Sequence, residues 1–296
     1  MENHSFQQIV GSPSAPYINN VLVKKGALLT QSYGVEHPSQ PNYLDLFSGS
    51  NQGVIDDSVP TGTPFSTPNL GAKLFAAGKT FATYSESLPS VGFTGASYTN
   101  DPGKNEYQRK HNPMVNWQAE DAPANNHLPM SANQPFTSFP STAVGYSSLP
   151  TVSFVIPNEQ HDIHDGTIPD GDTWLKNNLE GYRVWAMTHH SILLLTFDED
   201  DRNSANRITT IFVGQPIIPG KYAETPIARP AGGIDHFNIL RTIERRYLLG
   251  ICNADTDGAR KPIANIFRTA APTSANPAMV EDDDSADLSA SSAEQE

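Results

Sequence analysis

The chain has 296 residues, a formal net charge of −13 at pH 7 and a hydrophobic fraction of 37%. That length suffices for one large α/β domain or two smaller ones. The negative charge argues against binding to nucleic acid or to an anionic membrane surface. The single cysteine, Cys252, excludes an intrachain disulfide and a cysteine-based metal cluster.

The first half of the chain predicts few regular elements. A mildly apolar run covers 21–29, and the apolar spacing over 69–77 predicts a helix that ends at Gly78. A short strand is predicted at 80–84. Residues 87–150 are rich in Gly, Pro, Asn and Ser and weakly periodic, so we expect a loop-rich cap or insertion there.

The second half alternates regularly between strand and helix. The predicted strands are 151–156, 191–197 and 207–214, and the predicted helices are 172–187 and 236–249. Strands that alternate with helices of this length favour a mostly parallel sheet covered by helices on both faces. The apolar run in 191–197 is strand-sized, and no stretch of the sequence approaches the length of a membrane span.

The two ends of the chain differ from its middle. From Glu281 onward there are seven acidic residues and no basic one. The segment 269–296 is too poor in apolar residues to fold, so we expect a disordered acidic tail and a folded catalytic domain over 1–268. The N-terminus lacks the basic and apolar regions of a signal peptide.

Ser39 lies in a segment that restricts its backbone. Residues 36–43 read Glu-His-Pro-Ser-Gln-Pro-Asn-Tyr, so Ser39 lies between Pro38 and Pro41. Each proline fixes its own φ and disfavours the helical conformation in the residue before it. We therefore expect Ser39 to lie outside a regular helix and to project from a stiff turn, as a nucleophile or ligand would. An ordinary turn is the alternative.

Polar clusters follow two of the predicted strands. The strand at 151–156 leads into a segment with His161 and His164, and the strand at 191–197 leads into the four acids of 198–201. Ligands gather at the carboxyl ends of parallel strands, so both clusters are expected at one edge. Converging carboxylates and imidazoles usually indicate a divalent metal. A solvated surface turn is the alternative for each cluster taken alone.

Several segments match one family in chain order. They are Glu2-Asn3-His4-Ser5-Phe6, His37-Pro38-Ser39-Gln40-Pro41-Asn42-Tyr43, Tyr84-Ser85-Glu86-Ser87-Leu88-Pro89, Lys110-His111-Asn112-Pro113, His161-Asp162-Ile163-His164-Asp165, Gly171-Asp172-Thr173-Trp174-Leu175, Thr196-Phe197-Asp198-Glu199, Asp235-His236 and Leu240-Arg241-Thr242-Ile243-Glu244. Over about residues 1–267, the chain thereby resembles the phosphoesterase family that includes bacterial acid phosphatases and phospholipases C. The number of motifs in order, rather than any single one, carries the resemblance.

The resemblance implies an alkaline-phosphatase-like α/β/α sandwich and a metal-assisted nucleophile, which in this sequence is Ser39. It implies one or more divalent metal ions held by Glu2, Asn3, Ser39, Asp198 and Glu199. Family members usually carry a hydrophobic strand directly before the Glu-Asn pair, whereas only Met1 precedes Glu2 here. We therefore expect the first core strand upstream of Met1, and a secreted or periplasmic location for the full-length form.

The chemistry of these residue types fits that expectation. A serine hydroxyl is a poor nucleophile, and no G-x-S-x-G elbow surrounds Ser39. Coordination to a metal would lower its pKa, and a phosphoserine intermediate would then be hydrolysed by water. Side-chain donors would stabilise the transferring phosphoryl group, and a histidine would protonate the leaving oxygen. The predicted substrate-binding residues are Asn42, His111, His161 and His164, of which His161 and His164 are also the predicted catalytic histidines.

Other polar residues have two interpretations each. Glu86 either belongs to the active site or only fastens its loop. His236 either supports the start of a helix or belongs to the site. His4 is expected beside the ligands without being one, and His189 and His190 are expected at the opposite edge of the sheet.

The predicted function is metal-dependent hydrolysis of a phosphoric ester, most consistent with an acid-phosphatase-type phosphomonoesterase. The expected partner is a small-molecule phosphate ester or a phospholipid head group, with no nucleic acid and no transmembrane anchor. A phospholipase C that cleaves phospholipid diesters is one alternative, since apolar residues within 87–150 fit an interfacial entry as well as ordinary packing. A truncated, inactive paralogue that acts as a binding module is the other. Metal identity and oligomeric state stay open.

Overall fold

The computed structural model describes residues 1–223 and 232–268. Its strands are β1 (Ala27–Tyr33), β2 (Phe81–Ser85), β3 (Ser97–Tyr98), β4 (Tyr107–Gln108), β5 (Asn133–Pro135), β6 (Val152–Ile156), β7 (Ile192–Thr196), β8 (Arg207–Gly214) and β9 (Gly220–Tyr222). Its α-helices are α1 (Phe6–Ile9), α2 (Val23–Lys25), α3 (Ser39–Ser48), α4 (Leu70–Ala76), α5 (Ala143–Tyr146), α6 (Ile168–Ala186) and α7 (His236–Tyr247). Shorter helical segments are η1 (Ile18–Leu22), η2 (Arg109–His111), η3 (Pro113–Trp117), η4 (Ala124–Asn126), η5 (Met130–Ala132), η6 (Phe136–Ser138) and η7 (Asp257–Ala259). The segment 269–296, predicted to be an acidic tail, lies outside the described residues.

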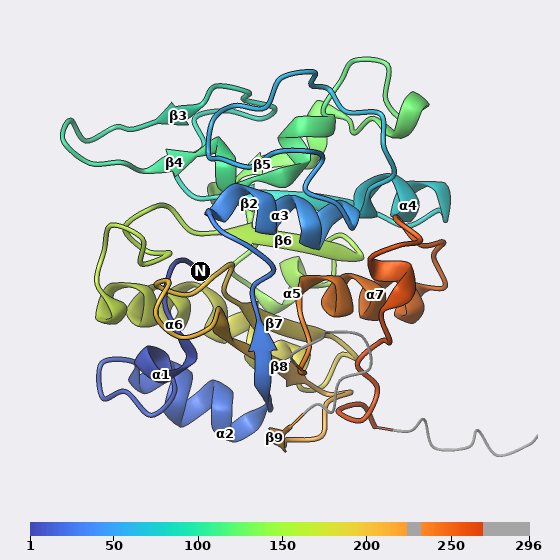
Figure 1. Ribbon diagram of the computed structural model, residues 1–296. Helices are drawn as coiled ribbons and strands as arrows, with labels where there is room; N and C mark the ends of the chain where they lie inside the picture. The colour runs from blue at the N-terminus through green and yellow to red at the C-terminus, as the bar shows by residue number, and fades with distance from the viewer. Residues whose placement is uncertain (224–231, 269–296) are drawn as a thin grey trace, which may run out of the picture.

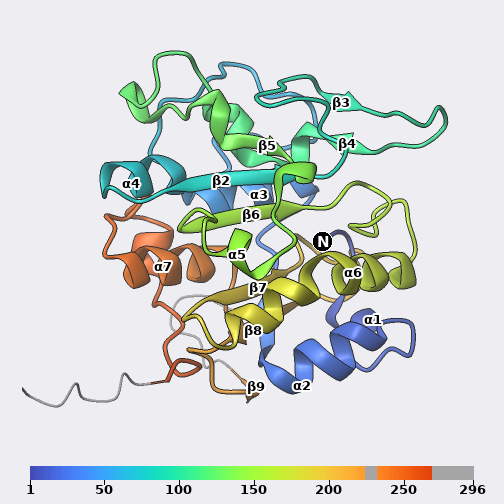
Figure 2. The same ribbon diagram turned by 180° about the vertical axis from the view of Figure 1, so that it is seen from behind.

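The strands and helices form an α/β/α sandwich. Helices α3 and α7 lie on one face of β6 and β7, and α5 and α6 lie on the other (Figures 1 and 2). Strands β5, β2 and β6 form a parallel sheet, in which Phe81 is opposite Val152 and Thr83 is opposite Asn133. Strands β7, β8, β1 and β9 form a second sheet. The fold class expected from the sequence is confirmed.

The second sheet is mixed rather than parallel throughout. Strand β8 runs antiparallel to β7 and to β1, whereas β1 and β9 run parallel. The link 197–206 joins β7 to β8 and contains no helix. A short link can only return the chain to a neighbouring antiparallel strand, because a parallel connection needs a longer crossover.

Apolar side chains fill both layers between sheet and helices. Leu175 of α6 belongs to one buried cluster together with Leu195 of β7 and Ile211 of β8. Phe47 of α3 belongs to another, and its ring makes an edge contact with the ring of Trp117. Burial of these side chains fixes α3 and α6 against the strands, and thereby fixes the segments that precede them.

Most of the predicted elements are confirmed to within a few residues, and the differences have local causes. Helix α6 begins at Ile168, before the predicted start at 172, because Thr167 and Asp170 form a capping box and Pro169 occupies the first turn. The apolar run 21–29 is divided at Gly26, where α2 ends and β1 begins.

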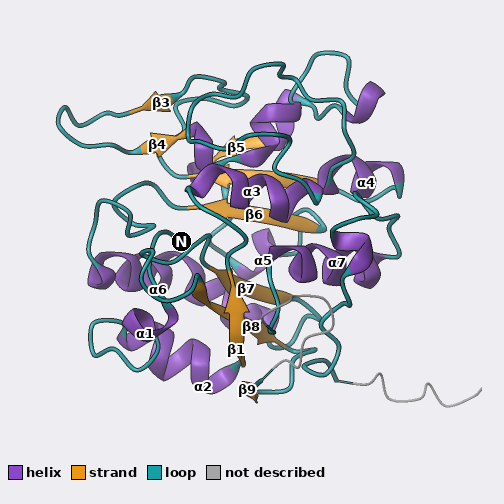
Figure 3. Ribbon diagram, viewed as in Figure 1, coloured by secondary structure: helices purple, strands orange, loops and turns teal. Residues whose placement is uncertain are grey.

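Loops dominate the segment 87–150, as Figure 3 shows. The segment also contains the β3–β4 pair and β5, and β5 joins the core sheet by pairing in parallel with β2. Within 1–223 and 232–268, no helix combines the length and hydropathy needed to cross a membrane.

Candidate active site

Three segments distant in sequence meet at the carboxyl ends of β6 and β7. The backbone carbonyl of Met1 accepts a hydrogen bond from the Asp198 N–H at 3.1 Å, just after β7. The Glu2 N–H donates to the Asp162 carbonyl at 2.8 Å, in the loop after β6. The Asn3 N–H donates to Asp198 Oδ1 at 3.2 Å. The N-terminal residues therefore bridge the two strand-end clusters that the sequence predicts.

Ser39 is the first residue of α3, with Pro38 at the N-cap position. The expectation that Ser39 lies outside a regular helix was wrong. The first N–H groups of a helix have no intrahelical partner, so Pro41 is tolerated within the first turn. The position still fixes Ser39 firmly, because its side chain is buried and lies at the start of a packed helix.

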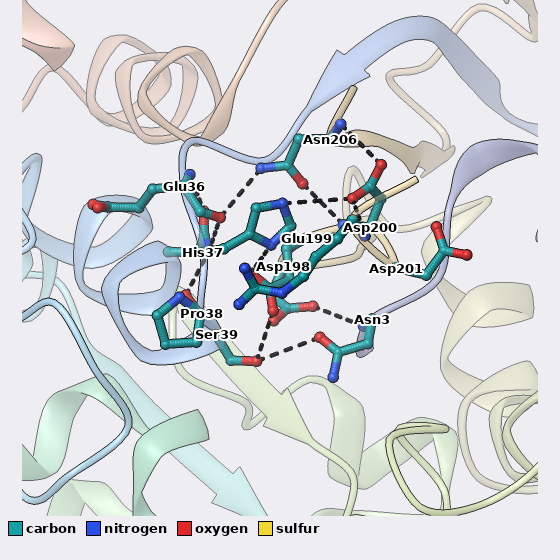
Figure 4. A network of polar contacts seen from close by, with 12 residues as sticks. Asn3, Glu36, His37, Pro38, Ser39, Asp198, Glu199, Asp200, Asp201 and Asn206 are labelled. Carbon is teal, nitrogen blue, oxygen red and sulfur yellow. Dashed lines mark hydrogen bonds and ion pairs between the residues drawn. The ribbon is translucent and has the colours of Figure 1, made fainter. Parts of the chain in front are cut away.

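The Ser39 hydroxyl faces the predicted metal ligands (Figure 4). Its Oγ donates to Glu2 Oε2 at 2.9 Å and lies 3.5 Å from both Asn3 Oδ1 and Glu199 Oε1. Asp198, the fifth predicted ligand, accepts a hydrogen bond from the Asn3 N–H. The structure thus brings together the five predicted ligands, which come from the N-terminus, α3 and the end of β7.

The electrostatics of this cluster fit a cation. Burial raises the pKa of Glu2 well above its ordinary value, and the charges of Asp198 and Asp162 add to the effect. Burial, followed by the charge of Asp198, raises the pKa of Glu199 to about 8. Among the described residues, Asp198 Oδ2 is buried without a hydrogen-bond partner. Oxygen donors that repel one another in this way match the preference of hard divalent cations.

His37 is a site residue that the sequence reasoning did not single out. Its Nδ1 lies 2.5 Å from Glu199 Oε2, and its Nε2 lies 3.5 Å from Asp200 Oδ1. The Asp200 carboxylate also accepts from the N–H groups of Arg202, Ser204 and Asn206, which shapes the loop after β7 (Figure 4). The sequence did contain a signal for His37 as a site residue, because His37 belongs to the motif of residues 37–43 around Ser39.

His161 and His164 carry acidic partners that favour their protonated forms. His161 Nδ1 lies 2.9 Å from Glu86 Oε2, and this hydrogen bond raises the pKa of His161. His164 Nδ1 lies 2.9 Å from Glu159 Oε2 and 2.7 Å from Asp165 Oδ1. The bond to Glu159 is the main cause that raises the pKa of His164 to about 9. Glu86 therefore contacts a predicted site residue as well as its own loop.

His111 is buried between the two clusters. Its Nε2 lies 3.4 Å from Glu2 Oε1 and its Nδ1 lies 3.2 Å from Asp162 Oδ2. Burial lowers the pKa of His111 to about 3 despite these neighbours. Tyr43 stacks on the His111 ring with 5.3 Å between centroids, and its hydroxyl donates to Glu2. Tyr43 was not identified as a site residue from the sequence, although it closes the motif around Ser39.

Asn42 is the predicted site residue whose position differs most from expectation. Its Oδ1 accepts from the N–H groups of Val35 and Glu36, and its Nδ2 donates to the carbonyls of Glu36 and Pro38. These bonds use the hydrogen-bonding capacity of the amide. Its side chain thus fixes the loop that leads to Ser39, and substrate binding by Asn42 is not supported.

His236 and His4 lie beside the site, whereas His189 lies away from it. His236 Nε2 donates to the Asp198 carbonyl at 2.6 Å, whereas Asp235 and Asn238 form the capping box at the start of α7. His4 Nδ1 donates to the Glu2 carbonyl at 3.0 Å. Both histidines therefore hydrogen-bond to the backbone of a predicted ligand residue, without belonging to the predicted ligand set themselves. His189 stacks on Trp185 before β7 begins, at the edge of the sheet opposite the site.

The model of the phosphoesterase family matches residues 12–250, which is most of the chain. The chain belongs to the phosphoesterase family. It is accordingly a phosphoric ester hydrolase, as the motifs predict.

Named relatives of this phosphoesterase agree with that assignment. It is 43% identical over 246 residues to a phosphatidylinositol-3-phosphatase of Mycobacterium tuberculosis, covering 83% of this chain and 74% of the relative. It is 34% identical over 208 residues to an acid phosphatase of Aspergillus fumigatus, covering 66% of this chain and 43% of the relative. The chain thus spans less than half the length of that fungal enzyme.

A solved structure supports the fold. A protein of the alkaline phosphatase superfamily from Vibrio parahaemolyticus superposes with a TM-score of 0.53 at 12% identity. The match covers 89% of this phosphoesterase and 69% of the other chain. At this identity the likeness concerns the fold alone, and it agrees with the α/β/α sandwich described above.

Proposed function

We propose that this phosphoesterase hydrolyses phosphate monoesters with Ser39 as the nucleophile. One observation carries the proposal: the buried Ser39 Oγ lies 2.9–3.5 Å from Glu2, Asn3 and Glu199, three oxygen ligands suited to a divalent cation. The expected substrate is a small phosphate ester or the phosphate of a lipid head group. The names of the mycobacterial and fungal relatives favour a monoester over a diester.

The proposed metal site consists of Glu2, Asn3, Ser39, Asp198 and Glu199. The orphaned Asp198 Oδ2 and the raised pKa values of Glu2 and Glu199 support a cation at this place. A divalent cation bound there would lower the pKa of the serine hydroxyl and offset the charge of the phosphoryl oxygens.

The chain's own residues have distinct roles in the proposed reaction. A divalent cation at the site would favour the ionised form of Glu2, whose Oε2 would then accept the proton of Ser39 as Oγ bonds to phosphorus and the bond from phosphorus to the ester oxygen breaks. His161 and His164, both favoured in their cationic forms, bind phosphoryl oxygens, and one of them donates a proton to the leaving oxygen. Water then attacks the phosphoserine and releases inorganic phosphate. His111, whose pKa is lowered by burial, lies beside Glu2 and Asp162 and is favoured in its neutral form.

Replacement of the nucleophile tests this proposal. We expect Ser39→Ala to lower kcat on an aryl phosphate by at least about a hundredfold while the melting temperature changes little. Ser48→Ala, at the other end of α3 and also buried, is the matched control and should keep its activity. Acid quenching during turnover should trap phosphate on wild type and not on Ser39→Ala. Retention of more than a few percent of activity in Ser39→Ala would exclude Ser39 as the nucleophile.

Removal of metal tests the ligand set separately. Dialysis against a chelator should abolish hydrolysis of the aryl phosphate, and a divalent cation should restore it. The same treatment should lower the melting temperature of wild type but not that of Asp198→Asn, because bound metal stabilises only a chain that can hold it. An aryl phosphate diester and phosphatidylcholine, assayed in parallel, test the specificity. A preference for either of them would assign the protein to the phospholipase C type.

A further inference from the structure

Three polar residues outside the candidate active site form a chain of hydrogen bonds. Ser66 lies in the loop before α4, and Asp121 and His127 lie on either side of η4. Ser66 Oγ is 3.4 Å from His127 Nε2, and His127 Nδ1 is hydrogen-bonded to the Asp121 carboxylate. Within the described chain, their other hydrogen bonds reach only residues 124–126. This group, which we call the Ser66 triad, is therefore separate from the predicted metal ligands.

The order of the bonds in the Ser66 triad sets the protonation of His127. The hydrogen bond to His127 lowers the pKa of Asp121, so the ionised carboxylate accepts a hydrogen bond from Nδ1. Nε2 then carries a lone pair that can accept the proton of the Ser66 hydroxyl. A serine becomes nucleophilic when an adjacent base takes its proton and a third group orients that base. Hydrogen bonds of this kind are often long in unliganded sites, as is the 3.4 Å separation of Ser66 from His127.

The backbone at Ser66 is held through its carbonyl groups, and two of its N–H groups are left available. The Thr67 carbonyl accepts from the indole N–H of the buried Trp117 at 2.9 Å. The Ser66 carbonyl accepts from Asn126 Nδ2 at 2.8 Å. By contrast, no group within 1–223 and 232–268 accepts a hydrogen bond from the N–H of Ser66 or of Thr67. The N–H groups of a nucleophilic serine and of its neighbour are those that stabilise the oxyanion in acyl transfer.

We propose that the Ser66 triad is a second catalytic centre, which hydrolyses short-chain carboxylic esters. Ser66 Oγ bonds to the acyl carbon while His127 Nε2 takes its proton, and the carbonyl oxygen becomes an oxyanion beside the two N–H groups. The ester C–O bond then breaks, and His127 returns the proton to the leaving alcohol. Water attacks the acyl-serine in the same way, which releases the carboxylic acid and restores the Ser66 hydroxyl.

The surroundings of the triad select the class of ester. Its hydrogen-bond partners among the described residues include no lysine or arginine, so the centre suits a neutral carboxylic ester better than a phosphate dianion. Ser66 and Thr67 are both exposed, so they offer little apolar surface for a long acyl chain. This activity requires neither Ser39 nor a metal ion.

Hydrolysis of 4-nitrophenyl acetate in the presence of a chelator tests the proposal. Wild type should hydrolyse this ester at least about tenfold faster than Ser66→Ala does. Asp121→Asn, at an exposed position, should lower kcat by about tenfold or more with little change in KM, because Asp121 acts only by holding the tautomer of His127. Ser90→Ala, at another exposed serine, is the matched control and should follow wild type. Equal rates for wild type and Ser66→Ala would overturn the proposal.

Covalent labelling of wild type gives a readout that does not depend on the folding of a variant. A fluorophosphonate forms a bond from phosphorus to an activated serine oxygen as fluoride leaves, and the base takes the serine proton. With a chelator present, peptide mass spectrometry should place the adduct on Ser66, and Asp121→Asn should be labelled about tenfold more slowly. An adduct on other serines alone, or none, would overturn the proposal. Hydrolysis of an aryl phosphate without chelator reports on Ser39 separately, so failure of one activity leaves the other tested.

Discussion

His161 and His111 are two imidazoles at one site with opposite electrostatics. His161 is partly exposed and hydrogen-bonded to Glu86, which favours its cationic form and raises its pKa. His111 is fully enclosed, and burial outweighs the charge of Glu159, so its pKa falls to about 3. In the proposed reaction, a phosphate ester would therefore meet a cation at His161, whereas the buried His111 is favoured in its neutral form beside Glu2 and Asp162.

We predict that Glu86→Gln changes the pH profile of catalysis. The hydrogen bond to Glu86 keeps His161 protonated to higher pH, so its loss lowers the pKa of His161. The alkaline limb of kcat/KM against pH should shift to lower pH, with activity about tenfold lower at pH 8 and little changed at pH 5.5. Glu120→Gln, at an exposed position, is the control and should follow wild type. A uniform loss at all pH values would indicate that Glu86 only holds its loop.

Helix starts explain much of the architecture at the scale of the elements. Asn69 begins α4 by accepting from the Ala72 N–H at 2.9 Å, and Asp235 begins α7 by accepting from the Asn238 N–H. Thr167 and Asp170 form the capping box of α6. These caps satisfy N–H groups that have no intrahelical partner. The caps thereby set the positions at which loops turn into packed helices.

The cap of α4 supports a prediction about stability. Asn69 is fully buried, and its Nδ2 also donates to the Asn126 carbonyl at 2.9 Å. Asn69→Ala should lower the free energy of unfolding by about 1–3 kcal/mol, because it removes the cap and takes this donor away from the partly buried Asn126 carbonyl. Asn69→Asp keeps the oxygen that accepts from the Ala72 N–H but loses the donor to the Asn126 carbonyl, so this variant measures the loss of the second hydrogen bond alone. Denaturant unfolding of both variants measures the two contributions, and equal stability of Asn69→Ala and wild type would contradict the assignment.

At the scale of the whole molecule, a buried pair of carboxyl groups joins α7 to the C-terminal part of the described chain. Glu244 Oε1 and Asp257 Oδ2 both accept from the Cys252 N–H, at 2.8 and 3.0 Å. Burial, followed by the charge of Asp257, raises the pKa of Glu244 from 4.5 to about 7. The folded state therefore binds this proton more tightly than the unfolded state does.

This pair makes stability depend on pH in a defined direction. A raised folded-state pKa contributes stability that is fully present below pH 4.5 and is lost as the pH rises through about 7. Glu244→Gln keeps an acceptor for Cys252 and cannot ionise. Between pH 4.5 and pH 8, the unfolding free energy of wild type should fall by roughly 2 kcal/mol more than that of Glu244→Gln. Urea unfolding across this range measures the difference, and parallel curves would contradict the predicted linkage.

The sequence determined the local elements and most of the site. Strand and helix positions follow from apolar periodicity and caps, which act over a few residues, so β6, β7, β8 and α7 were predicted closely. The motif around Ser39 and the acids at 198–199 also identified the residues that meet at the strand ends. The helical state of Ser39 was not predicted, because the conformational preferences of proline were taken to exclude a helix. The first turn of a helix tolerates proline, and Pro41 lies in the first turn of α3.

Only the tertiary structure decided the long-range relations. The antiparallel direction of β8, the pairing of His37 with Glu199 and the turn of Asn42 toward its own loop depend on contacts between distant segments. Burial, which lowers the pKa of His111, and the hydrogen bond to Glu159, which raises the pKa of His164, are likewise properties of the folded chain. The cavity of about 570 Å³ that β6 and β7 line belongs to the same class. Apolar periodicity predicts each strand by itself, whereas a space between two strands exists only once both are packed under their helices.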